Sequence, residues 1–293
     1  MLIRPKNNPG TTSRHAEAHV PGNTEKSVPT KRAVLALQVG TDLDPGLRRK
    51  HKPNEDTLLV THGTIPSVSS APTPFALFAV ADGMGGHAHG QEASRLAVDT
   101  LARSVGEWLN SPPRRSDGFL PLLIEGVRSA NQAVYQRNQG QRDHMGTTIT
   151  AALVIDTTAY VAHAGDSRCY LYRPSTGLSQ ITHDHSVVAA LVDVNVIRPD
   201  DIYSHPMRNL IYRSLGEKAS VEVDGSTVPL AAGDVLLLCS DGLWEMVRDP
   251  QIAAILSEPT SDPSKPAHAL IQAALARGGE DNVSAIVVKV GYA

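Results

Sequence analysis

The chain has 293 residues, of which 41% are hydrophobic and 19% are charged, as is typical of a globular protein and not of a disordered or fibrous one. Its formal net charge of −3 at pH 7 provides no overall basic field, which argues against nucleic acid or an acidic membrane as a partner. Any functional signal must therefore lie in local clusters of charge.

The cysteine content and the N-terminus favour a cytoplasmic location. Cys169 and Cys239 are the two cysteines, and each lies in an apolar run where cysteine usually behaves as a small buried residue. A disulfide framework is therefore not expected, which favours a reducing compartment. The first residues lack the apolar stretch of a secretory signal, and no apolar run is long enough to span a membrane.

The composition divides the chain into a tail and one folded domain. Residues 1–31 are polar and rich in Pro, Ser, Thr, Lys and His, so they cannot bury enough apolar surface to offset the entropy lost on ordering. We expect this tail to be disordered and residues 32–293 to form a single domain.

Short runs rich in Val, Ile, Leu and Thr, bounded by Gly, Asp, Pro or Asn, predict nine strands. The predicted strands cover residues 33–39, 57–61, 75–81, 148–155, 158–164, 168–173, 221–228, 234–240 and 283–290. Apolar residues recur every three or four positions over 92–109, 119–137 and 264–276, which predicts three helices, the last capped by Ser264. Consecutive strands that do not alternate with helices favour an antiparallel β-sandwich of the α+β class.

Acidic residues recur at the predicted strand ends and tight turns. Their motifs are, in chain order, Asn54-Glu55-Asp56, Asp82-Gly83-Met84-Gly85-Gly86-His87, Asp143-His144-Met145-Gly146-Thr147-Thr148, Gly165-Asp166-Ser167-Arg168, Asp241-Gly242-Leu243-Trp244 and Glu280-Asp281-Asn282-Val283-Ser284. A single Asp-Gly is more often a simple turn, but several such motifs together favour a site. Carboxylates at buried strand ends need cations as partners, and few Lys or Arg are interleaved, so hard divalent ions such as Mg²⁺ or Mn²⁺ are expected.

The six motifs, in this order, resemble those of metal-dependent protein phosphatases of the 2C type, in the bacterial form, over about residues 33–290. The resemblance implies an α+β fold in four layers, an antiparallel β-sandwich flanked by helices on both faces. It also implies a pair of Mg²⁺ or Mn²⁺ ions, with a third ion at a weaker site. The implied metal contacts, direct or through water, come from Glu55, Asp56, Asp82, the Gly83 carbonyl, Asp241, Asp281 and, at the third site, Asp143.

Three further roles follow from the resemblance. His87 matches the histidine proposed to protonate the leaving group. The family's phosphate-binding arginine, five residues before the aspartate of Asn-Glu-Asp, corresponds to His51, so either protonated His51 or a neighbour such as Arg49 is expected to bind phosphate. Residues 191–213 correspond to the family's flap, where substrate preference is expected. Asp166, by contrast, is interpreted as part of a supporting turn.

The implied activity is hydrolysis of phosphoserine and phosphothreonine in proteins modified by a serine/threonine kinase, by a monomeric enzyme. Two divalent ions would lower the pKa of a bridging water, which attacks phosphorus directly without a phosphoenzyme. One alternative is a pseudophosphatase that keeps the fold and recognises phosphoproteins without turnover, which the His51 departure favours. A two-metal nuclease and a zinc protein are also open, but the net charge argues against the first and the lack of cysteine partners for the histidines against the second.

Overall fold

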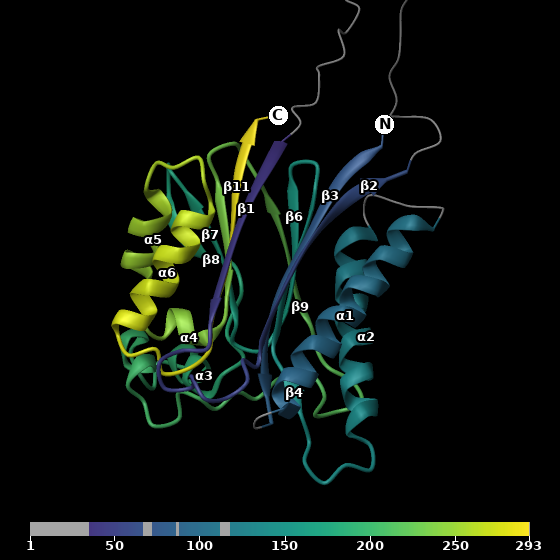
Figure 1. Ribbon diagram of the computed structural model, residues 1–293, viewed down its shortest axis with the longest axis vertical. Helices are drawn as coiled ribbons and strands as arrows, with labels where there is room; N and C mark the ends of the chain where they lie inside the picture. The colour runs from purple at the N-terminus through teal and green to yellow at the C-terminus, as the bar shows by residue number, and fades with distance from the viewer. Residues whose placement is uncertain (1–34, 67–71, 86–87, 112–117, 293) are drawn as a thin grey trace, which may run out of the picture. The chain divides into compact units, whose positions relative to one another are not determined.

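The computed structural model describes residues 35–66, 72–85, 88–111 and 118–292. Its centre is formed by two antiparallel sheets (Figure 1). The strands are β1 (Leu35–Asp44), β2 (Asp56–Ile65), β3 (Thr73–Met84), β4 (Gly146–Thr147), β5 (Ile149–Ile155), β6 (Thr158–Ala164), β7 (Arg168–Arg173), β8 (Gly177–Gln180), β9 (Asp224–Pro229), β10 (Val235–Cys239) and β11 (Val283–Tyr292). Sheet A has the order β1-β11-β10-β7-β8, and sheet B has the order β2-β3-β5-β6-β9, with β4 paired to β3.

Helices cover the outer face of each sheet. They are α1 (Ala88–Asn110), α2 (Phe119–Asn138), α3 (Val187–Asp193), the 3₁₀ helix η2 (Pro199–Tyr203), α4 (Asp241–Trp244), α5 (Asp249–Ser257) and α6 (Ser264–Ala276). Figure 1 shows α1 and α2 packed on sheet B, and α5 and α6 packed on the opposite side, on sheet A. The predicted four-layer α+β sandwich is therefore confirmed.

Three hydrophobic cores fill the spaces between the four layers. One lies between α1, α2 and sheet B, a second between sheet A and its helices, and a third between the sheets. Neighbouring residues of one strand enter different cores, because side chains alternate between the faces of a strand. In β10, Leu236 packs between the sheets and Leu237 packs under the helices. Both faces of the central strands are buried, which explains why their sequences are continuously apolar.

The first and last strands of the described chain pair along their whole length. The register of β1 and β11 runs from Leu35 opposite Tyr292 to Asp44 opposite Val283. This pairing places the loop that follows β1 against the loop that precedes β11. Gly46, with a φ of +78°, lies so close to that loop that a Cβ would be 2.0 Å from the Asp281 carbonyl oxygen.

The elements agree with the sequence prediction where the apolar pattern is long. Strands β6 and β7 and helix α6 have the predicted bounds, and each predicted strand is found. The short elements β8, α3, α4 and α5 were not predicted. The predicted cap of α6 was wrong, because Ser264 is its first residue and Pro263 occupies the cap position. The predicted tail, residues 1–31, lies outside the described residues, and no helix within the described ranges is long and apolar enough to cross a membrane.

Candidate active site

The two sheets bring their acidic residues to the same end of the sandwich. From sheet B, Asp56 begins β2 and lies directly opposite Asp82 of β3. From sheet A, Asp241 follows β10 and Asp281 precedes β11. A cavity of about 390 Å³ opens at this end. It is lined by Arg48, Arg49, Glu55, Asp82, Gly83, Met84, Thr148, Asp166, Arg208, Asn209, Ile211, Asp241, Glu245, Glu280 and Asp281.

Hydrogen bonds from neighbouring strands hold Asp82 and Asp56 in place. The backbone of Asp82 accepts from the Thr148 amide at 2.8 Å and from the Thr147 hydroxyl at 2.9 Å, and its amide donates to the Thr148 hydroxyl at 3.0 Å. One carboxylate oxygen of Asp56 accepts from the hydroxyls of Ser240 and Ser284, each at 2.7 Å. Because Ser284 lies on β11 and Ser240 directly follows β10, both of sheet A, while Asp56 belongs to sheet B, the bonds also tie the two sheets together.

Several acidic oxygens in this cluster are buried without a partner. Glu55 Oε1, Asp56 Oδ1 and Asp241 Oδ1 have no hydrogen-bond partner among the described residues. Burial, and then the surrounding carboxylates, raise the pKa of Asp56 to about 7 and that of Asp241 to about 6. Burial and the Asp241 carboxylate raise the pKa of Asp82 well above its usual range. An unpaired buried carboxylate costs free energy, so bound positive charge would stabilise this cluster.

Arg49 supplies a positive charge inside the cluster. Its guanidinium donates to Glu55 and to Asp281, while its Nε is buried without a partner among the described residues. Within those residues, no three acidic, histidine or cysteine side chains are gathered tightly enough to hold one ion as they stand. The Arg49 guanidinium therefore lies between the Glu55 and Asp281 carboxylates.

The backbone around Gly83 is packed too tightly for any other residue. A Cβ at this position would lie 2.0 Å from the Gly90 carbonyl oxygen at the start of α1, and 2.8 Å from the Glu55 carbonyl oxygen. The Gly83 amide donates to the latter at 3.1 Å, and the Glu55 amide donates to the Asn282 side chain at 2.8 Å. Oxygen donors, several of them unpaired, and closely approached backbone carbonyls are the ligands that Mg²⁺ and Mn²⁺ prefer. The residues present therefore fit such ions.

The flap region forms one wall of the cavity. Its Arg208 lies 3.6 Å from Glu245 and 3.3 Å from Glu280, and Glu280 also pairs with Arg48 at 3.2 Å. Burial and the Asp241 carboxylate raise the pKa of Glu245 to about 7. Glu245 and Arg208 were not singled out in the sequence. Glu245 follows directly on the Asp241–Trp244 motif, which is the signal that could have identified it.

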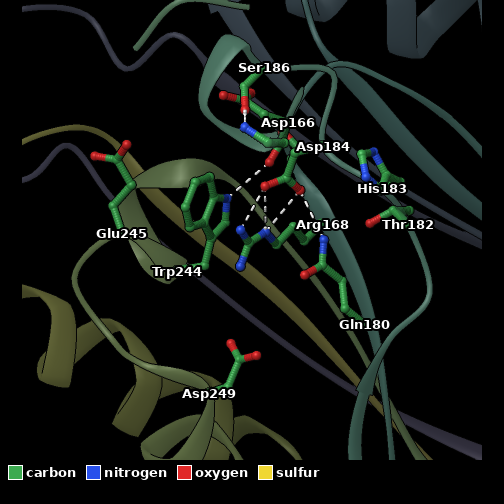
Figure 2. Close-up of polar contacts among 12 residues, drawn as sticks. Asp166, Arg168, Gln180, Thr182, His183, Asp184, Ser186, Trp244, Glu245 and Asp249 are labelled. Atoms are coloured by element: carbon green, nitrogen blue, oxygen red, sulfur yellow. Dashed lines mark hydrogen bonds and ion pairs between the residues drawn. The ribbon is translucent and has the colours of Figure 1, made fainter. Parts of the chain in front are cut away.

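Asp166 was interpreted as part of a supporting turn, and the structure places it both in that turn and in the wall of the cavity. Its side chain is buried and lines the cavity. Burial and the Asp241 and Asp184 carboxylates raise its pKa well above the usual range. Its backbone carbonyl accepts from Trp244 Nε1 at 2.9 Å (Figure 2). Asp166 therefore belongs to the acidic cluster, although it also forms the turn between β6 and β7.

The remaining candidates are placed differently. His51 is exposed and is not among the residues that line the cavity, whereas Arg49 is. Asp143 is also exposed and does not line the cavity. His87 lies outside the described residues. His185 stacks on His163 with ring centroids 4.8 Å apart and accepts from the Gly165 amide, which is a structural role.

The chain is similar to known proteins over most of its length. Residues 47–277 match the family model "Protein phosphatase 2C". The chain is 37% identical over 212 residues to the serine/threonine phosphatase Stp of Listeria welshimeri. These residues make up 72% of this chain and 82% of that protein. The crystal structure of the Mycobacterium tuberculosis serine/threonine phosphatase PstP/Ppp is 36% identical, with a TM-score of 0.72, and the match covers 87% of this chain and 99% of that one.

A second similar structure contains metal ions. The catalytic domain of serine/threonine protein phosphatase PstP in complex with two manganese ions is 35% identical, with a TM-score of 0.71, and the match covers 88% of this chain and 99% of that one. The family model spans well over half of the chain, and the relatives share its fold at more than 30% identity. The chain therefore belongs to the protein phosphatase 2C family.

Proposed function

We propose that this chain is a metal-dependent serine/threonine protein phosphatase that hydrolyses phosphoserine and phosphothreonine by direct attack of water. The observation that carries the proposal is the cluster of buried carboxylates with unpaired oxygens, which two sheets of a protein phosphatase 2C fold bring to one cavity. Divalent ions bound there would supply an activated water and neutralise charge on the phosphoryl oxygens. A cysteine nucleophile is not supported, since burial raises the pKa of Cys169 to about 12.

The acidic residues divide by position into two groups. We assign Asp82, the Gly83 carbonyl, Asp241 and Asp281 as direct ligands of Mg²⁺ or Mn²⁺, because they line the cavity and the three aspartates are only half-buried. Glu55, which also lines the cavity, and Asp56 are buried and would hold metal-bound waters or complete the coordination. Asp143 is retained as part of a third, weaker site.

Arg49 is the residue we assign to substrate phosphate. Its planar guanidinium suits two phosphate oxygens, and it lies in the cavity. Ions that engage Glu55 and Asp281 would release the guanidinium, which could then turn to the phosphate. With Arg49 in this role, the lack of an arginine at position 51 no longer favours a pseudophosphatase. His87 is retained as the proton donor to the leaving hydroxyl.

The substrates we propose are phosphoproteins modified by a serine/threonine kinase, in the cytoplasm. The flap, residues 191–213, contributes Arg208, Asn209 and Ile211 to the cavity wall. Loops on a rigid scaffold commonly determine specificity, so this segment would contact the polypeptide around the phosphorylated residue.

The test is hydrolysis of para-nitrophenyl phosphate and of a phosphothreonine peptide, with Mn²⁺, with Mg²⁺ and with EDTA. Wild-type turnover should require added metal and no thiol. Arg49→Ala should raise the KM for both substrates by about tenfold or more, because a charge-assisted pair of hydrogen bonds is worth about 1.5–3 kcal/mol. His51→Ala is the matched control and should leave KM unchanged. Turnover that persists in EDTA would contradict the metal assignment. A KM that rises in His51→Ala and stays unchanged in Arg49→Ala would contradict the assignment of Arg49 to phosphate.

A further inference from the structure

A buried ion pair lies beside Asp166, outside the cavity (Figure 2). Arg168 Nε donates to Asp184 Oδ1 at 2.9 Å and Nη2 donates to Oδ2 at 2.6 Å, and both side chains are at most 5% exposed. Gln180 donates to the same Asp184 carboxylate at 2.9 Å. A buried ion pair is often no more stabilising than a well-packed apolar pair, so stability alone does not explain it. What it fixes is the plane of the Arg168 guanidinium.

That plane supports the indole of Trp244. The guanidinium carbon of Arg168 lies 3.6 Å from the Trp244 ring centroid, and Arg168 Nη1 donates to the Tyr170 hydroxyl at 2.7 Å. Figure 2 shows the indole beside the Arg168 guanidinium, with its N–H directed at the Asp166 backbone. The direction of this hydrogen bond therefore depends on the Arg168 guanidinium, which packs against the ring of Trp244.

The hydrogen bond from Trp244 acts on the peptide that carries the Asp166 carboxylate. The turn is held on either side by other groups: the Gly165 amide donates to His185 at 3.0 Å, and the Ser167 carbonyl accepts from Thr150 at 2.7 Å. The Asp166 carbonyl is held by the indole at 2.9 Å. A shift of the indole would therefore move the Asp166 carboxylate relative to the other acidic residues of the cavity.

The flap contacts the same indole. Tyr203, the last residue of η2, meets Trp244 edge to face with ring centroids 6.2 Å apart. The guanidinium carbon of Arg248 lies 3.1 Å from the Tyr203 ring centroid. A second cavity, of about 600 Å³ and lined in part by Arg168, Tyr203 and Arg248, borders this stack. Tyr203 therefore connects the flap, the indole and the wall of this cavity.

We infer that Arg168 and Trp244 are positioning residues of this phosphatase. Arg168, held by Asp184, fixes the Trp244 indole, and the indole holds Asp166 so that its carboxylate contributes to the metal-binding cluster. Through Tyr203, the position of the flap acts on the same carboxylate. This inference rests on the proposed function, because it concerns how tightly the proposed site binds its ions.

Trp244 itself provides a signal that does not depend on turnover. The chain has two tryptophans, Trp108 and Trp244. Trp108 packs against Phe119 in the helical layer on sheet B, so the full-length Trp108→Phe variant makes Trp244 the sole tryptophan. In this background, Mg²⁺ should change the Trp244 emission with the same half-saturation as it activates hydrolysis of para-nitrophenyl phosphate. Mg²⁺ binding is also measured by calorimetry.

Two variants separate the stacking of Arg168 from the hydrogen bond of Trp244. Arg168→Lys keeps the charge opposite Asp184 but lacks the flat guanidinium, and Trp244→Phe keeps an aromatic ring but removes the N–H donor. Each should raise the Mg²⁺ concentration for half-saturation about fivefold or more, with the KM for para-nitrophenyl phosphate unchanged. Arg173→Lys is the matched control. Arg173 lies at the other end of the same strand and pairs with Asp234 in the same way, at 2.9 and 2.7 Å. Its guanidinium also donates to the Pro229 carbonyl, whereas that of Arg168 stacks on Trp244, so Arg173→Lys should shift nothing.

The possible results are distinct. If Arg168→Lys unfolds, Trp244→Phe carries the test, since it deletes one hydrogen bond and little volume. Folded variants that match Arg173→Lys in Mg²⁺ half-saturation would overturn the inference alone. A wild-type chain that neither binds Mg²⁺ in calorimetry nor hydrolyses the phosphate would overturn the proposed function, and the inference with it.

Discussion

Replacement of Asp241 by asparagine should stabilise the metal-free chain while abolishing metal-dependent turnover. Asp241 Oδ1 is buried without a hydrogen-bond partner among the described residues, and burial with the Asp281 charge raises the pKa of this carboxyl to about 6. The folded chain therefore binds this proton more tightly than the unfolded chain does. As a result, the free energy of unfolding falls as the pH rises from about 4 to about 6, and stays lowered above that.

The size of the effect follows from the two pKa values. The difference between 3.8, the ordinary value, and about 6 in the folded chain corresponds to about 3 kcal/mol at pH 8, at 1.36 kcal/mol per pH unit. Asparagine has nearly the same shape and no charge, so Asp241→Asn should recover a gain of this order. For a domain of this size, about 3 kcal/mol raises Tm by roughly 6–12 °C. At pH 5 the advantage of the variant should fall to about half.

Thermal unfolding followed by circular dichroism provides the measurement, in EDTA at pH 8 and pH 5 and again with Mg²⁺. Wild type should gain about 2.7 kcal/mol when Mg²⁺ is a hundredfold above its Kd, and the variant should gain little. Asp234→Asn is the control of opposite sign. Asp234 pairs with Arg173, which holds the pKa of this buried carboxyl down, so its loss should lower Tm in every buffer. An Asp241→Asn protein that melts below wild type in EDTA at pH 8 would refute the reasoning.

Three further outcomes are expected. Gly83→Ala should cost several kcal/mol in urea unfolding, because its Cβ would meet the Gly90 carbonyl, whereas Gly106→Ala, with open space around it in α1, should add about 0.5–1 kcal/mol. Burial lowers the pKa of His163 to about 4, so the free energy of unfolding should be highest above about pH 6.5 and fall by about 3 kcal/mol as the pH drops to 4. In His163→Gln the free energy of unfolding should fall less over the same pH range. Because the Cys169 thiol is buried with a raised pKa, iodoacetamide should leave Mg²⁺-dependent turnover intact, and rapid inactivation would contradict a cysteine-free mechanism.

The sequence predicted the layers of the fold because long apolar patterns persist in the structure. The bounds of β6 and β7 were predicted because each strand is apolar and ends at a turn. Helix α4 was missed because it has four residues, Asp241–Trp244, which is too short for a helical repeat. Its first residue is Asp241, so the acidic residue was singled out in the sequence although the helix that carries it was not predicted.

The site was predicted in its acidic residues and less well in its surroundings. Counting back from Asp56 pointed to His51, but the chain turns between Gly46 and Lys52, with the Arg49 amide bonded to Gly46 and the Lys52 amide to Arg49, so Arg49 faces the cavity. The place of Asp166 in the cavity wall was not predicted, because a turn at the surface and a turn beside a cavity can have the same Gly-Asp pattern. Only packing of two sheets reveals which carboxylates share a cavity, and sequence spacing does not contain that information.

The pairing of β1 with β11 has a consequence for how the enzyme is made. During synthesis β1 leaves the ribosome long before its partner β11, which Asp281 directly precedes. Until β11 has emerged, the cavity lacks Asp281, and the loop with Gly46 and Arg49 lacks the segment that it packs against. Contacts between such distant segments form slowly and late. A growing chain should therefore remain without phosphatase activity, however many of its acidic motifs have already been translated.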